Sequence, residues 1–216
     1  QKEYMSVVTE AIRQMFPREG YANRMENVTH GMMRFASGKM SSRRGNVVTG
    51  ESLIRDAKEA IMEIIKDRDF TDTEKKEVAE AVGVAAIKYS ILRSGLGNDI
   101  IFDFDKSISF EGDSGPYLQY AATRARAICR KAEEGGVKSS LKVPTDSTIA
   151  VERILERFPS VAYRAMEERE PHYIATYLME LSGCFNNFYA REHIIDANDP
   201  TSPYKVAVAG AVAVVM

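Results

Sequence analysis

The sequence contains little cysteine, no excess of positive charge and no long apolar run. Cys129 and Cys184 are its only cysteines, and two thiols so far apart supply neither a disulfide framework nor metal-ligand spacing. The plain interpretation is a pair of buried thiols in a reducing compartment, so the cytoplasm is the expected location. The formal net charge is −2 at pH 7, so any contact with nucleic acid would need a local basic patch.

Membrane and metal sites also lack support in the sequence. The longest apolar run, residues 206–216, is too short to span a bilayer, and no signal peptide is visible. The three histidines are isolated and show no metal-ligand spacing, so we predict no metal site. The chain begins with Gln1 and ends within an apolar helical pattern that has no stop signal. We therefore expect a fragment of a longer protein.

What the sequence does contain is mainly helical periodicity. With 216 residues, 44% of them hydrophobic, the chain can form the core of one large domain or two small ones. Thr71 and Glu74 fit a capping box at the start of one helix, and Gly95 suits its C-terminal end. Apolar residues at helical spacing predict helices over 4–16, 53–67, 71–95, 116–134, 149–158, 171–189 and from 204 onward.

Two short stretches break this pattern and favour extended structure. They are residues 27–35 and residues 99–105, where Asp103 and Asp105 alternate with phenylalanines and are expected on the solvent side of a strand. After Pro116, helices joined by short connections predict helix-on-helix packing. The expected fold is mainly α.

One basic loop stands out, with the sequence GKMSSRRGNV at residues 38–47. Lys39, Arg43 and Arg44 place three positive charges beside the hydroxyl groups of Ser41 and Ser42. Arginine offers a planar fork for phosphate oxygens and lysine a mobile point charge, so the loop could stabilise charge on a triphosphate during nucleotidyl transfer. Composition alone favours the simpler interpretation of a solvated basic turn.

A second candidate surface lies on the helix after Pro116. Tyr117, Tyr120 and Arg124 recur at i, i+3 and i+7, so they share one face. Arg126 and Arg130 share another. Aromatic rings can stack on unpaired bases while guanidinium groups hold phosphates. The alternative is that the tyrosines are half-buried and the arginines merely solvated, because the same helix also has an apolar face.

Four ordered blocks resemble one family. The block GMMRFASGKMSSRRGNVV resembles the KMSKS loop of class I aminoacyl-tRNA synthetases, in the variant found in arginyl-tRNA synthetases. The later blocks AIKYSILRSG, FDFDKSISFEGDSGPYLQYAATRARAI and ELSGCFNNFYAREHI are similar to successive stretches of the same family. The resemblance covers nearly the whole chain. It implies the C-terminal end of a Rossmann-like catalytic domain over 1–105 and an all-helical anticodon-binding bundle over 106–216.

The resemblance also implies roles for individual residues. Lys39, Met40 and Ser41 match the first three positions of the family loop, which closes over ATP and stabilises the transition state of adenylation. Ser42 occupies the position of the second lysine, so Arg43, or else Arg44, is expected to supply that charge. The expected catalytic residues are therefore Lys39 and Arg43. The residues expected to bind tRNA are Tyr117, Tyr120, Arg124 and Arg126.

The same resemblance identifies a missing part. The H-x-G-H string with which the family binds ATP occurs nowhere in the sequence. We therefore expect the parent protein to join arginine to its tRNA using ATP, with Mg²⁺ accompanying the nucleotide, and this chain alone to be inactive. One alternative is a non-catalytic helical tRNA-binding module, against which the retained KMSSRR loop speaks. Another is a helical interaction scaffold. An H-x-G-H string upstream would distinguish the enzyme from both.

Overall fold

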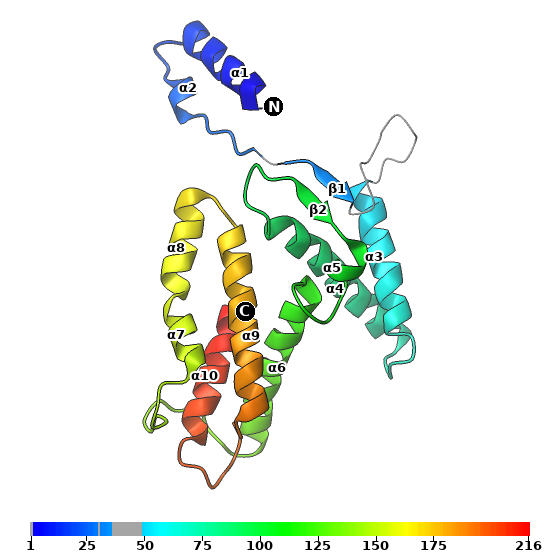
Figure 1. Ribbon diagram of the computed structural model, residues 1–216, viewed down its shortest axis with the longest axis vertical. Helices are drawn as coiled ribbons and strands as arrows, with labels where there is room; N and C mark the ends of the chain where they lie inside the picture. The colour runs from blue at the N-terminus through cyan, green and yellow to red at the C-terminus, as the bar shows by residue number, and fades with distance from the viewer. Residues whose placement is uncertain (1, 30, 36–48) are drawn as a thin grey trace.

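The computed structural model describes residues 2–29, 31–35 and 49–216, and it is mainly helical, as the sequence predicts (Figure 1). The elements in chain order are α1 (Lys2–Met15), α2 (Tyr21–Arg24), β1 (Met33–Phe35), α3 (Gly50–Ile64), α4 (Asp72–Leu92), β2 (Ile100–Phe102), α5 (Phe104–Ser107), α6 (Gly115–Glu134), α7 (Ala150–Glu156), α8 (Phe158–Glu168), α9 (His172–Arg191) and α10 (Ser202–Val215).

The N-terminal half is built around a two-stranded parallel sheet with α3 and α4 packed against each other. β1 pairs with β2 in the register Met33–Ile100 to Phe35–Phe102, and the long connection between parallel strands contains both helices. The predicted capping box is confirmed, because Thr71 accepts from the Glu74 amide and the Glu74 carboxylate accepts from the Thr71 amide. α1 and α2 lie apart from the rest of this half (Figure 1).

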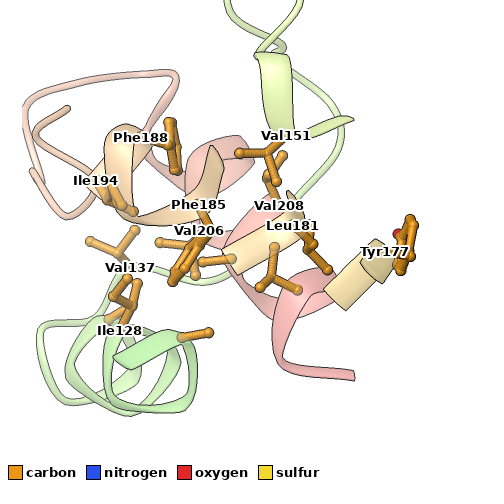
Figure 2. Close-up of a cluster of buried hydrophobic side chains, with 14 residues drawn as sticks. Ile128, Val137, Val151, Tyr177, Leu181, Phe185, Phe188, Ile194, Val206 and Val208 are labelled. Carbon is orange, nitrogen blue, oxygen red and sulfur yellow. The ribbon is translucent and has the colours of Figure 1, made fainter. Parts of the chain in front are cut away.

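The C-terminal half is a helical bundle with one continuous apolar core. α9 supplies Leu181 and Phe185, which are fully buried, and they belong to one cluster with Val206 of α10 and Ile128 of α6 (Figure 2). Burying a side chain of this size stabilises the fold by about 1.5–3 kcal/mol. The predicted helix-on-helix packing of the second half is therefore confirmed.

The two halves meet where α4 crosses the start of α6. Gly115 has no side chain, and a Cβ there would overlap the carbonyl group of Ala85 in α4. Beside it the Tyr89 hydroxyl donates to Asp113, which also pairs with Arg93. Burial, and then the bond to this carboxylate, raise the pKa of Tyr89. A close backbone approach and a small polar cluster thus fix α4 against α6.

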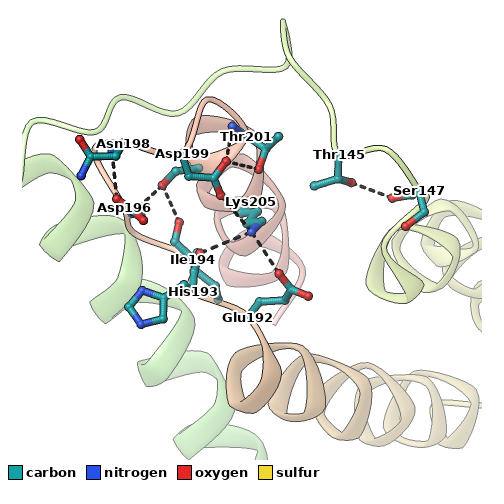
Figure 3. A network of polar contacts seen from close by, with 11 residues as sticks. Thr145, Ser147, Glu192, His193, Ile194, Asp196, Asn198, Asp199, Thr201 and Lys205 are labelled. Atoms are coloured by element: carbon teal, nitrogen blue, oxygen red, sulfur yellow. Dashed lines mark hydrogen bonds and ion pairs between the residues drawn. The ribbon is translucent and has the colours of Figure 1, made fainter.

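A buried lysine, Lys205, contacts several residues of the loop between α9 and α10. Lys205 is the one charged residue that is buried in the described part of the chain. Its Nζ lies 3.0 Å from Glu192 Oε2, 3.1 Å from Asp199 Oδ2 and 3.5 Å from the His193 carbonyl oxygen (Figure 3). These contacts give the ammonium group the charged and polar partners that a buried cation requires.

Several local predictions are wrong. Asp103 is not on a strand surface: it caps α5 by accepting from the Lys106 amide, and Asp105 lies in that helix. Gly97, not Gly95, takes the positive φ after α4. The helix α8 was not predicted. Cys129 and Cys184 are free but only partly buried, and burial raises the pKa of each thiol.

We predict that Gly115→Ala destabilises the protein by about 1–3 kcal/mol, the usual cost of an added group in a well-packed contact. The new methyl group would meet the Ala85 carbonyl, so α4 and α6 would have to separate. Urea unfolding followed by circular dichroism measures the change. The matched control is Gly183→Ala within α9, where a Cβ meets nothing within 4 Å and alanine should stabilise the helix by about 0.5–1 kcal/mol. Equal stability of both variants would contradict this account of the junction.

We also predict a contribution of Asp199 to acid stability. Hydrogen bonds from the Thr201 side chain and amide, together with Lys205, lower the pKa of Asp199 from 3.8 to about 2. Between these values the unfolded state binds more protons, so stability should fall as pH falls through this window. Melting temperatures at pH 5, 4, 3 and 2.5 should fall less steeply in Asp199→Asn than in the wild type. The exposed Asp146→Asn serves as the control, and parallel curves for all three proteins would refute the assignment.

Candidate nucleic-acid interface

The predicted nucleotide loop falls on residues that the structure does not describe. Lys39, Met40, Ser41, Ser42, Arg43 and Arg44 all lie between residues 36 and 48, outside the described ranges. The flanking elements are described. The preceding strand β1 ends at Phe35, and α3 begins at Gly50, after the N-cap residue Thr49. The loop therefore connects the carboxyl end of a parallel strand to a helix, the place where α/β folds commonly bind ligands.

The second predicted surface is well defined, and its centre is Arg124. The guanidinium carbon lies 4.5 Å from the ring centroid of Tyr120 and 4.4 Å from that of Tyr189. One ring comes from α6 and the other from α9, so the cation lies between two aromatic groups. Its Nη2 also donates to the Tyr120 hydroxyl over 2.7 Å. Arg124 therefore connects the two helices at the protein surface.

Asn186 of α9 completes this cluster. Its Oδ1 accepts from Arg124 Nη1, and its Nδ2 donates to the Tyr117 hydroxyl over 2.9 Å. The predicted common face of Tyr117, Tyr120 and Arg124 is therefore present in the structure. Tyr117 is half-buried, while Tyr120 and Tyr189 are 50% and 44% exposed. The exposed rings are the ones available to stack with another molecule.

A groove of about 660 Å³ runs from this cluster along α6 and the segment after α9. The lining residues with a charged or imidazole side chain are Arg124, Lys131, Arg191, Glu192 and His193. Three of them are permanently cationic near neutral pH, and only one is acidic. In a protein of net charge −2, this is a local basic patch of the kind that an anionic partner requires.

The structure does not place Arg126 with this cluster. Residues two apart on a helix face different directions, so Arg126 lies on the other flank of α6, together with Arg130. Arg126 is exposed, and no hydrogen bond or ion pair restrains its side chain within the described ranges. Arg130 lies 3.9 Å from Glu134. Arg124 and Arg126 therefore belong to different surfaces.

Four residues of the Arg124 cluster and of the groove are not among the predicted site residues. Helical spacing with Phe185 and Phe188 predicts that Tyr189 belongs to the core; those two are buried, but Tyr189 is not. Asn186 offers no sequence signal, since its partners lie more than sixty residues away. Lys131 follows Arg124 by seven residues, a repeat of the same face that was available from the sequence. Arg191 follows the apolar pattern of the predicted 171–189 helix, and nothing in the sequence links it to α6.

Two of the three histidines lie within the described residues. His172 Nδ1 lies 2.8 Å from Glu170 Oε2, and the imidazole of His193 points away from Lys205 toward α6 (Figure 3). His30 lies outside the described residues. Across residues 2–29, 31–35 and 49–216 no group of three or more His, Cys, Asp or Glu side chains could hold a metal ion.

The helices of the described chain are also either too short or too polar to cross a membrane.

Comparison with sequence families gives two adjacent matches. Residues 1–104 match the model of the catalytic domain of class I tRNA synthetases of the arginine type, and residues 118–216 match that of the DALR anticodon binding domain. The groove lies in the second match. The segment containing the basic loop lies in the first.

Individual relatives agree with these matches. The chain is 31% identical over 207 residues to an arginine–tRNA ligase of Lactobacillus johnsonii, covering 95% of this chain and 37% of the relative. It is 35% identical over 178 residues to an arginine–tRNA ligase of Clostridium acetobutylicum, covering 80% and 31% respectively. The chain thus spans about a third of the length of the curated relatives it matches.

Solved structures show the same fold. Thermus thermophilus arginyl-tRNA synthetase superposes with a TM-score of 0.71 at 28% identity, covering 86% of this chain and 32% of that one. Arginyl-tRNA synthetase from Plasmodium falciparum has a TM-score of 0.64 at 20% identity, over 86% and 32% of the two chains, and supports the fold alone. The two family matches, the curated relatives and the Thermus structure agree with the four sequence blocks, and the chain belongs to the arginyl-tRNA synthetase family.

Proposed function

We propose that this chain is part of an arginine–tRNA ligase that works in the cytoplasm. The complete enzyme would activate arginine with ATP as arginyl-adenylate and transfer it to tRNA. Residues 1–105 would form the end of the catalytic domain, and residues 106–216 the anticodon-binding bundle. The two family matches support this division, since one ends at residue 104 and the other begins at residue 118.

The observation that carries the proposal is the basic groove beside Tyr120 and Tyr189. RNA loops present unstacked bases and phosphates, which bind aromatic faces and cationic side chains respectively. The groove offers both kinds of group within the part of the chain that matches an anticodon binding domain. We therefore assign tRNA contact to this face of α6 and α9.

The contacts of Arg124 determine its role in binding. The two rings hold the guanidinium and Asn186 fixes its rotation, so its remaining N–H donors are oriented before RNA arrives. Little side-chain entropy would then be lost on binding a phosphate. Tyr117 would act indirectly, by holding Asn186 in place.

Arg126 would contact tRNA in a different way. Its exposed, unrestrained side chain lies on the opposite flank of α6, so it could reach only RNA that extends around the helix. A mobile cation contributes to affinity mainly through long-range attraction, which salt screens. We therefore expect Arg126 to contribute less to binding than the groove residues.

The adenylation chemistry would depend on the basic loop. Lys39 and Arg43 would face the charge that develops on the triphosphate as arginine attacks, with Met40, Ser41, Ser42 and Arg44 completing the ATP-binding loop. Cations placed where charge develops stabilise the transition state more than the ground state. Mg²⁺ would accompany ATP, but we assign it no ligand in this chain, because the described residues offer no suitable cluster.

In the complete protein, Lys39→Ala and Arg43→Ala should each lower the kcat of arginine-dependent ATP–pyrophosphate exchange, measured with tRNA present, by about 100- to 1000-fold. The KM for arginine should change little, because these groups would act on the transition state. Arg44→Ala should have a milder effect. An unchanged kcat with a raised KM for arginine would remove the loop from catalysis, and preference for another amino acid would overturn the proposed substrate.

For tRNA binding, we predict that Lys131→Ala and Arg191→Ala each reduce the slope of log affinity against log salt by about 0.7–0.9, the loss of one phosphate contact. Tyr120→Ala should weaken binding by about 1–3 kcal/mol with the slope retained, because stacking releases no counterions. Arg124→Ala should reduce both affinity and slope, and Arg126→Ala should reduce the slope only slightly. Titration of a fluorescent anticodon stem-loop of arginine tRNA at several salt concentrations measures these changes.

The control for charge alone is Arg153→Ala. This exposed arginine lies on α7, which packs against α9 and α10, and it is not among the residues that line the groove. Its removal should leave the slope within error of the wild type. If Arg153→Ala and Lys131→Ala reduced the slope equally, binding would be a property of overall charge and not of this face. The tyrosines of the α6–α9 surface would then serve only in packing, and its cationic side chains would only be solvated.

A further inference from the structure

The segment between α9 and α10 forms one wall of the groove, and a buried cation holds it in place. Residues 191–195 line the groove opposite α6. The Lys205 ammonium reaches this segment from α10 and contacts both the Glu192 carboxylate and the His193 carbonyl oxygen. Asp199 holds the same ammonium from the far side of the loop. The Lys205 side chain is only 11% exposed, so it lies behind the wall and cannot itself be a main RNA contact.

The direction of Glu192 matters for a groove that attracts anions. Glu192 is the one acidic residue among the described residues that line it. Its carboxylate binds Lys205 at 3.0 Å, on the side of the wall away from α6, while the His193 imidazole points toward α6 (Figure 3). Arg191 and His193 thus bring a cation and an imidazole to the groove, while the carboxylate between them in sequence pairs with Lys205.

We propose that Lys205 is a positioning residue for RNA binding: it holds Glu192 and the His193 carbonyl so that Arg191 and His193 face the groove. This inference rests on the proposed function of the groove. Without the ammonium group, Glu192 and Asp199 would lose a shared partner and repel each other. The segment would then rearrange, with the Glu192 carboxylate free to face an RNA phosphate.

The first test is Lys205→Met in the complete protein, which keeps the length of the side chain and removes its charge. Binding of the fluorescent anticodon stem-loop should weaken by about five- to tenfold at ~0.1 M salt, and the salt slope should fall by about 0.7–0.9, as expected for one lost phosphate contact. Lys58→Met is the control. It removes a lysine that also pairs with an acid, Glu80, but lies in α3 on the other half of the molecule. Its slope should equal that of the wild type.

The second test replaces Glu192, the exposed partner of the ion pair, and leaves the buried Lys205 unchanged. Glu192→Gln keeps an oxygen that can accept from Lys205 but loses the negative charge, so RNA should bind as tightly as to the wild type or more tightly. Glu192→Ala loses both the charge and the contact. If the contact with Lys205 holds the 191–195 segment in place, Glu192→Ala should bind RNA more weakly than Glu192→Gln, although the two variants have the same charge. Because Glu192 is 45% exposed, both variants are expected to fold even if Lys205→Met does not.

The outcomes separate this inference from the proposal on which it rests. A wild-type protein that fails to bind the stem-loop would refute the proposed function of the groove. Wild-type binding with an unchanged slope in folded Lys205→Met would assign Lys205 to the stability of the fold alone and overturn the inference. Equal binding by Glu192→Ala and Glu192→Gln would also overturn it, because charge would then explain the whole effect.

Discussion

A guanidinium group held between two phenol rings keeps its charge but loses most of its freedom to move. In this protein the rings belong to different helices, so the same contact that restrains Arg124 also fixes how α9 is rotated against α6. The side chains of Tyr189 and Arg191 then occupy defined places beside Lys131. The shape of the basic groove therefore depends on the α6–α9 contact more than on any residue that faces solvent.

Helix α6 can form this contact because its sequence gives each side of the helix a different role. Ala125 and Ile128 face the bundle core, and Gly115 allows the backbone of α4 to approach its first turn. Tyr120 and Arg124 occupy the flank next to α9. A change on one side would alter the position of the others, since the helix is a single rigid element. The halves of the chain and the groove are consequently coupled through one helix.

Sequence periodicity predicts most of helix α6, but it predicts little about which residues of other helices pack against it. The common face of Tyr117, Tyr120 and Arg124 follows from helical spacing, which is a local property. Whether a ring on α9 is buried depends on the rotation set by tertiary packing, so Tyr189 could not be separated from Phe185 and Phe188. The same helical spacing places Arg126 on another face, together with Arg130. Local hydrogen bonding, not alternation, determines the conformation at Asp103.

Overall acidity and a local basic surface are compatible here because charge is distributed unevenly over short distances. Between Arg191 and Lys205 the chain carries Glu192, Asp196 and Asp199, yet the wall of the groove remains basic. The Asp199 carboxylate accepts a hydrogen bond from the Thr201 amide and pairs with Lys205. The Asp196 carboxylate accepts a hydrogen bond from the amide of Asn198. Each such bond directs a carboxylate into the loop. A protein can therefore present a cationic groove without a positive net charge, provided that its nearby acids have internal partners, and in this loop a buried lysine is one of those partners.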